Sequence, residues 1–253
     1  MAHYKVILAY DGTHFLGFQR QGAARTVLST VEDALRRLGW QERALLSAGR
    51  TDSGVHASGQ VIAFDLVWNH SLEDLLAALN AHLPEDVAAR AAEEVTAEFH
   101  PRFDALERRY RYRLCAGPLR DPLRERYAWR VWPEPDAAAM NAAAGLLRGT
   151  HDFAAFGAPH KAGGSTIRCV TAAAWQPEGD GWVFEIRGNA FLYHQVRRTV
   201  WALVQVGQGR LSREAVSAAV LTAQPLPPGL APACGLELTE VRYPVEGEDE
   251  RRR

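Results

Sequence analysis

The hydrophobic and polar positions of residues 4–95 predict strands and helices in a definite order. Residues 4–10, YKVILAY, alternate between apolar and polar positions, as a half-buried strand does. Residues 26–39 repeat apolar positions every three or four residues, as a helix that ends at Gly39 does, and residues 71–84 follow the same pattern with Ser71 as N-cap. Further strands are predicted at 43–48, 60–67 and 87–95. This β-α-β-β-α-β order is the ferredoxin-like arrangement, a four-stranded sheet with two helices on one face.

A looser second copy of the same pattern follows, with an insertion. Its predicted elements are a strand at 107–115, a helix at 136–149 bounded by Asp136 and Gly149, strands at 166–176 and 181–188, a helix at 191–207 and a strand at 235–243. We therefore expect an α+β protein built from two ferredoxin-like units whose sheets lie side by side. The expected domains are residues 1–104 and 105–244, and the charged tail at 245–253 is predicted to be disordered.

Composition limits the class of protein. The 253 residues are 47% hydrophobic and 23% charged, and they contain no run of eighteen apolar residues. The first residues enter the strand pattern directly, without the basic and apolar regions of a signal peptide, so we expect a cytoplasmic protein. The three cysteines, Cys115, Cys169 and Cys234, are far apart and never in C-x-x-C spacing, which predicts neither a disulfide framework nor a zinc site.

The charge is unevenly distributed although the net charge is only −1. Residues 101–130 contain nine arginines and four acidic residues, and aromatic residues are interleaved among them: Tyr110, Tyr112, Tyr127 and Trp129. Arginine and tyrosine together suit phosphates and unstacked bases, which favours a nucleic-acid partner. A solvated, arginine-rich strand face is an equally good interpretation of the composition alone.

Residues 47–60, SAGRTDSGVHASGQ, place Arg50, Asp52 and His56 among three glycines on the connection between the second and third predicted strands. A carboxylate is ionised at neutral pH and can act as a nucleophile or a base. An Asp in such a segment more often caps a turn, and one His beside one Asp is far from a metal site. Phosphate-loop, zinc-deaminase, H-E-x-x-H and dinucleotide-binding motifs are all missing from the sequence, which leaves cofactor-free chemistry by an Asp.

Residues 48–61, AGRTDSGVHASGQV, resemble the signature loop of the TruA-type tRNA pseudouridine synthases. The resemblance continues in family order through residues 10–21, 99–113, 149–156, 188–198 and 231–238, and so spans nearly the whole chain. The sequence departs from the family pattern at Phe18, where Trp is usual, at Leu28, where Gln is common, and in the form of FLYHQVRR. None of these departures falls on a residue that the resemblance makes catalytic.

The resemblance implies an enzyme that isomerises uridine to pseudouridine at positions 38, 39 and 40 of the tRNA anticodon stem-loop. It implies no cofactor, no metal and a homodimer. Asp52 matches the family's catalytic Asp, which either attacks C1′ of the ribose or takes the 2′ proton, and the sequence does not choose between these routes.

The remaining site residues are implied by the same resemblance. Tyr110 matches the tyrosine that stacks on the flipped base, with Tyr112 on the same face less certain. Arg50 is expected to displace the target nucleotide, Arg197 to pair with Asp52, and Leu236 to line the base pocket. For Arg197 a structural role is also open, since Tyr193, Arg197 and Trp201 form one helical stripe that could simply cover the sheet.

Two other functions are compatible with these patterns. Paired ferredoxin-like units with basic, aromatic strands could serve as a non-catalytic RNA-binding module. The same fold could also act on another RNA. Asp52 favours an enzyme over a binding module, because a carboxylate in an RNA-binding groove repels phosphate.

Overall fold

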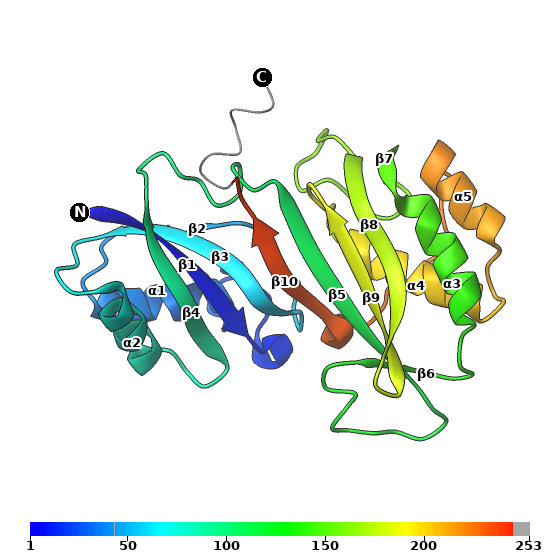
Figure 1. Cartoon of the computed structure of the whole chain (residues 1–253), viewed down its shortest axis with the longest axis horizontal. Helices are drawn as coiled ribbons and strands as arrows, with labels where there is room; N and C mark the ends of the chain where they lie inside the picture. The colour runs from blue at the N-terminus through cyan, green and yellow to red at the C-terminus, as the bar shows by residue number, and fades with distance from the viewer. Residues whose placement is uncertain (43, 245–253) are drawn as a thin grey trace. The chain divides into compact units, whose positions relative to one another are not determined.

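A computed structural model describes residues 1–42 and 44–244. The tail at 245–253, for which disorder was predicted, lies outside the described residues. The chain divides into two compact units (Figure 1). Unit 1 comprises residues 1–106 and the described chain from Leu238 onward, and unit 2 comprises residues 107–237. The domain limits predicted from the sequence stay predictions.

Unit 1 follows the predicted order of strands and helices. Its elements are β1 (Ala2–Tyr10), η1 (Gly12–His14), α1 (Val27–Arg37), β2 (Leu46–Ser47), β3 (His56–Leu66), α2 (Leu72–His82) and β4 (Val87–Val95), joined at the end of the chain by β10 (Leu236–Arg242). Within this unit the strand order is β4-β1-β3, with the short β2 also on β3. β1 runs antiparallel to both of its neighbours, with Val6 opposite Ile62 of β3 and Ala92 of β4.

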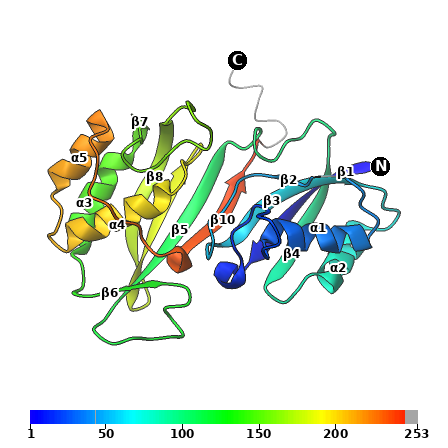
Figure 2. The ribbon, with the colours of Figure 1, turned by 180° about the vertical axis from the view of Figure 1, so that it is seen from behind.

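Local sequence explains where the two helices of unit 1 begin and end. Thr26 caps α1 through a reciprocal hydrogen-bonded box with Ser29, and Gly39 beyond its end has a φ of +93°. Ser71 caps α2 in the same way with Asp74. The two helices contact each other, as the view from behind illustrates (Figure 2). Their apolar faces and the inward side of β1 and β3 form the core of the unit.

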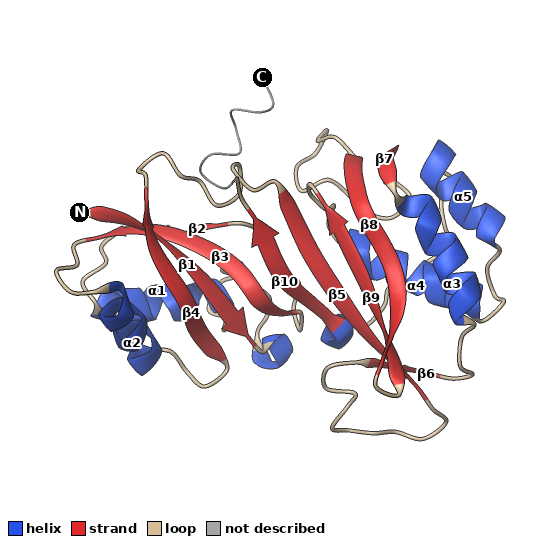
Figure 3. Ribbon diagram, in the orientation of Figure 1, coloured by secondary structure: helices blue, strands red, loops and turns tan. Residues whose placement is uncertain are grey.

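Unit 2 repeats the order with additions (Figure 3). Its elements are β5 (Glu107–Ala116), β6 (Trp129–Val131), α3 (Ala137–Ala144), η2 (Gly145–Leu147), β7 (Gly149–Asp152), β8 (Ile167–Glu178), β9 (Gly181–Gly188), α4 (Gln195–Gly207), α5 (Arg213–Thr222) and η3 (Ala233–Gly235). The strand order is β5-β9-β8-β7, and β6 runs parallel to the end of β5. The predicted hairpin of β8 and β9 is confirmed, with Trp175 opposite Phe184.

The structure differs from the predicted elements in several places. Helix α4 begins at Gln195 rather than at residue 191, because His194 has a φ of +64° and cannot continue a helix toward the N-terminus. Of the strand predicted at 43–48, the structure has Leu46–Ser47 as β2, and residue 43 lies outside the described residues. Strands β6 and β7 and helix α5 were not predicted, although Ser212 is a regular N-cap for α5. The α+β class and the β-α-β-β-α-β order are confirmed.

The described helices are short. None of them, within residues 1–42 and 44–244, is long and apolar enough to cross a membrane.

Candidate active site

Asp52 lies at the start of a tight turn in the connection between β2 and β3. The backbone carbonyl of Asp52 accepts a hydrogen bond from the N–H of Val55 at 3.1 Å, and Gly54, the third residue of the turn, has a φ of +77°. A positive φ at that position favours glycine. The backbone of Asp52 thus closes the turn, and the Asp52 side chain is half-buried.

A buried tyrosine lies beneath the residue that precedes Asp52. The hydroxyl groups of Tyr10 and Thr51 are 2.8 Å apart, and the side-chain amide of Gln60 donates to the carbonyl of Gly49 at 3.1 Å. Burial raises the pKa of Tyr10 to about 12, against the lowering effect of its hydrogen bonds with Thr51 and Gln60. These contacts fix both ends of the segment that leads into the Asp52 turn.

The segment 11–18 holds the same turn from the other side. The N–H of Phe18 donates to the carbonyl of Thr51 at 3.0 Å, and the hydroxyl of Ser53 donates to the carbonyl of Phe15 at 3.2 Å. A Cβ on Gly17, whose φ is +80°, would lie 2.9 Å from the Thr51 carbonyl oxygen, and a Cβ on Gly12 would lie 2.1 Å from that of Val55. Only glycine permits this approach.

These supporting residues were not assigned a role from the sequence. The signal that could have found them is the resemblance over residues 10–21, which contains Tyr10 and both close-packed glycines. His56, by contrast, was singled out and lies in β3 rather than in the connection. It is buried, and its Nδ1 accepts a hydrogen bond from the N–H of Gly12 at 3.0 Å, which ties β3 to the supporting segment.

Arg50 is exposed two residues before Asp52. The exposed position leaves Arg50 accessible to a ligand.

The two tyrosines of β5 have different environments. Tyr112 is fully buried, and its hydroxyl donates to the carbonyl of Pro232 at 2.8 Å. Burial raises the pKa of Tyr112 well above its ordinary value. Tyr110 is half-buried and packs edge-on against Phe191, with ring centroids 5.3 Å apart. Of the two, Tyr110 therefore has the ring that a base could reach.

Arg197 and Trp201 pack beneath the loop of residues 223–232. The Arg197 Nε donates to the carbonyl of Ala231 at 2.8 Å, and the ring of Trp201 lies so close to Gly229 that a Cβ there would overlap it. The helical stripe that contains them is thus covered by this loop, whereas Tyr193 at its other end is 48% exposed. Leu236, the first residue of β10, is buried.

Most arginines of β5 and the following loop have acidic partners within unit 2. Arg109 pairs with Glu185, Arg111 with Glu178 at 2.6 Å and Arg113 with Glu237 at 2.7 Å. Burial raises the pKa of Glu185, but the hydrogen bonds from Arg109 and Arg187 outweigh it and hold that pKa below its ordinary value.

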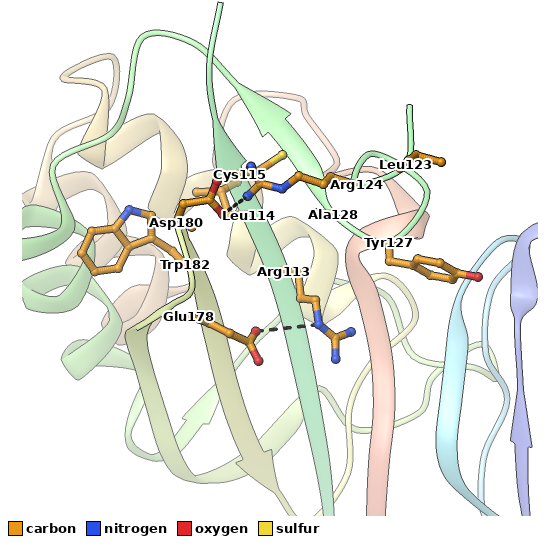
Figure 4. Close-up of a pocket in the computed structure, with 11 residues that line it drawn as sticks. Arg113, Leu114, Cys115, Leu123, Arg124, Tyr127, Ala128, Glu178, Asp180 and Trp182 are labelled. Carbon is orange, nitrogen blue, oxygen red and sulfur yellow. Dashed lines mark hydrogen bonds and ion pairs between the residues drawn. The ribbon is translucent and has the colours of Figure 1, made fainter. Parts of the chain in front are cut away.

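The loop of residues 117–128 shows the same pairing. Residues of this loop line a pocket of about 280 Å³. In Figure 4 the Arg124 side chain points toward Asp180 and that of Arg113 toward Glu178. The Arg124–Asp180 distance is 2.6 Å. The arginine-rich stretch is therefore much less positive than its composition suggests.

No group of three or more His, Cys, Asp and Glu side chains that could hold a metal ion occurs in residues 1–42 and 44–244. The three cysteines are free thiols, and Cys115 is buried. The expectation of a metal-free, cofactor-free site stays a prediction.

A comparison with known protein families finds a match over most of the chain. The sequence profile of a family described as tRNA pseudouridine synthase matches residues 6–104 and 143–244. The chain belongs to this family. Both of the matched regions include candidate residues, since the first contains the Asp52 turn and the second contains Arg197 and Leu236.

Individual relatives agree with the family match. The chain is 40% identical to the tRNA pseudouridine synthase A of Roseiflexus castenholzii, over 98% of this chain and 93% of that protein. It is 42% identical to the protein of the same name from Methylobacterium nodulans, over 96% and 97%. The corresponding protein of Shouchella clausii is 40% identical over 93% and 91%.

Proposed function

We propose that this protein isomerises uridine to pseudouridine in the anticodon stem-loop of tRNA, at positions 38, 39 and 40. The observation that carries the proposal is the turn that contains Asp52: backbone hydrogen bonds and two close-packed glycines hold this turn in a chain of the pseudouridine synthase family. Relatives at about 40% identity over nearly the full chain are named tRNA pseudouridine synthase A.

The proposed reaction is an isomerisation in which no atom is gained or lost overall. The bond between N1 and C1′ breaks, the uracil turns while it is held, and C5 bonds to C1′. The proton of C5 leaves and N1 ends with a proton. Asp52 either attacks C1′ as a nucleophile or takes the 2′ proton as a base, and both roles require its ionised carboxylate.

The uridine must leave the base stack before its C1′ can be reached, which costs a few kcal/mol. We assign this part of the reaction to four side chains. Arg50 displaces the nucleotide, Tyr110 stacks on the flipped base, Leu236 lines the base pocket and Arg197 pairs with Asp52. The exposure of Arg50 and the half-buried, rather than buried, ring of Tyr110 are consistent with these assignments.

The proposal also covers the compartment, the oligomeric state and the cofactor requirement of the protein. We propose that the enzyme works in the cytoplasm as a homodimer on tRNA and needs neither a metal nor an organic cofactor.

The experiment is position-resolved mapping of pseudouridine in unmodified tRNA transcripts after incubation with the purified protein, with and without a chelator. We expect modification confined to positions 38, 39 and 40 and unchanged by the chelator. Binding without any modification would favour the non-catalytic RNA-binding module. Modification of ribosomal or small nuclear RNA in a parallel reaction, with tRNA unmodified, would identify another substrate. Loss of activity with the chelator would contradict cofactor-free chemistry.

A further inference from the structure

Two segments of the family resemblance, residues 149–156 and 188–198, meet in unit 2, and most of their residues have no role in the reaction above. The N–H of Tyr193 donates to the carbonyl of Ala158 at 2.9 Å, which joins the loop 153–158 to the segment that precedes α4. A Cβ on Gly157 would lie 2.6 Å from the Tyr193 carbonyl oxygen, so glycine is required for this contact. The two segments are therefore held in one arrangement by their backbones.

The two segments line an open pocket of about 550 Å³. Its lining combines small residues of the 154–158 loop with the side chains of Tyr193, His194 and Arg198. This volume lies within the range of about 300–1,000 Å³ that small-molecule sites occupy. The small residues leave room for a planar group beside the aromatic ones.

The aromatic side chains in the pocket stack on each other. The rings of Tyr193 and His194 stack with centroids 3.7 Å apart, and the Tyr193 side chain is 48% exposed. His194 has a φ of +64°, a conformation that is uncommon for any residue other than glycine and is found more often at functional sites. An exposed tyrosine ring is a suitable platform on which a base can stack.

Arg198 differs from the paired arginines of β5. Its side chain is half-buried in the pocket lining, and within the described residues it has no hydrogen-bond or ion-pair partner. Arg109, Arg111 and Arg113, in contrast, each have an acidic partner. A guanidinium without a carboxylate partner in an open pocket suits an anionic ligand such as a phosphate.

The segment that carries this pocket also contacts Tyr110. Phe191 packs on the Tyr110 ring, and Tyr193 follows Phe191 by only two residues. Cα atoms two residues apart are at most about 7 Å from each other. A polynucleotide strand with one base at Tyr110 therefore has its neighbouring nucleotides within reach of the pocket.

We propose that this pocket binds a second unstacked nucleotide of the substrate RNA, with its base against Tyr193 and a phosphate at Arg198. The proposal rests on the proposed function, since it takes the ligand to be the same RNA whose uridine reacts. Stacking on an aromatic ring accepts any base. The pocket thus fixes the position of the RNA strand without demanding a particular sequence.

The test measures dissociation constants for an RNA anticodon stem-loop in which one loop nucleotide at a time is abasic. In the wild type, we expect one abasic position besides the target to weaken binding about tenfold, the size of one base–aromatic stack. Tyr193→Ala weakens binding of the intact RNA by a similar factor, and the abasic change at that position then has no further effect. Tyr193→Phe keeps the ring and binds within about twofold of the wild type.

Arg198 is tested through the salt dependence of binding. Arg198→Gln is expected to weaken binding of every RNA alike and to reduce the slope of log affinity against log salt by about one. The matched control is Arg210→Gln, which removes the same charge from an exposed position beyond the other end of α4. The control is expected to leave the slope unchanged.

Three results would overturn the inference. If the losses of binding free energy caused by Tyr193→Ala and by an abasic nucleotide add up at every position of the RNA, no base contacts Tyr193. Equal slope changes for the Arg198 and Arg210 variants would show that Arg198 has no phosphate contact of its own, and absence of RNA binding would contradict both proposals. If the wild type binds RNA but forms no pseudouridine, the proposed function fails. The non-additive effect of Tyr193→Ala and the abasic nucleotide on RNA affinity then still tests whether the pocket binds a nucleotide.

Discussion

Unit 1 and unit 2 repeat one order of strands and helices, yet they place their polar side chains differently. In unit 1 the candidate chemistry lies in a turn between strands, held by backbone carbonyls, by Gly12 and Gly17, and by the buried hydroxyl of Tyr10. In unit 2 charged side chains run along β5 itself and are paired with acids of β8, β9 and β10.

The difference corresponds to two tasks, which are holding a reacting group and binding a long ligand. A reacting carboxylate must be held within a fraction of an ångström, which close-packed backbone achieves. A surface for a long, flexible ligand needs rings and charges spread over a wider area, with only some of the charges left without acidic partners. We therefore expect substitutions in unit 1 to change turnover most and substitutions in unit 2 to change binding most.

The largest expected effect is that of Asp52→Asn, which keeps the size of the side chain and removes its charge. Turnover should fall by several orders of magnitude, on the order of 8 kcal/mol of lost catalysis, while tRNA affinity stays equal or increases slightly. Single-turnover assays and filter binding measure the two effects. The matched control, Asp33→Asn on the exposed face of α1, should retain wild-type turnover. Parallel losses of turnover and affinity would contradict the division of tasks.

The next largest effect is expected where the turn is supported. Gly17→Ala and Gly12→Ala force the backbone of Thr51–Val55 to move, and displacement of a catalytic group by about 1 Å can cost about 100-fold in rate. Gly39→Ala is the control, because Gly39 has a φ of +93° but no atom within 4 Å of the added Cβ. It should lower the melting temperature and leave turnover unchanged. Wild-type turnover in both Gly12 and Gly17 variants would show that the close packing is not needed.

In unit 2, Tyr110→Ala should weaken binding and slow the reaction through a lost stacking contact of about 1–3 kcal/mol. Tyr110→Phe should retain most of both, since the ring remains. Tyr112→Phe provides the comparison within the strand: it removes the buried hydrogen bond to Pro232 and should lower stability by about 1 kcal/mol without a matching loss of affinity. If substitution of Tyr112 weakened RNA binding and substitution of Tyr110 did not, Tyr112 and not Tyr110 would be the residue that stacks on the base.

The smallest effect concerns alkaline pH. Tyr10 has an ordinary pKa of 10.0 and a folded-state pKa of about 12, so the folded protein keeps this proton where the unfolded chain loses it. The stability from this group is complete below pH 10 and is lost progressively as the pH rises through about 12. Tyr10→Phe should flatten this part of the curve in denaturant unfolding. An unchanged slope in the variant would contradict the burial of the Tyr10 hydroxyl.

Most of unit 1 could be predicted from its sequence because its signals are local. The periodicity of 26–39 and the caps Thr26 and Ser71 depend on residues within three or four positions of each other. The support of the Asp52 turn could not be predicted in this way, because Gly12 and Gly17 meet residues about forty positions away.

Unit 2 was less predictable for the same physical reason. The arginines of β5 suggest a positive surface, but their partners Glu178, Glu185 and Glu237 lie more than sixty residues further along the chain. The left-handed conformation of His194 shortens α4 at a position where the apolar pattern continues smoothly. Alanine-rich α5 was missed because small residues give a weak helical pattern, even though Val216, Ala219 and Val220 are buried.

The most direct test of the central claim follows the hydrogen at C5 of uridine, which must leave when C5 bonds to C1′. Transcribed tRNA carrying tritium at C5 of its uridines is incubated with the wild type and with Asp52→Asn, and tritium released to water is measured over time. We predict release by the wild type in step with pseudouridine formed, and none above background by the variant despite normal binding. Release by Asp52→Asn at more than a few per cent of the wild-type rate would contradict the account.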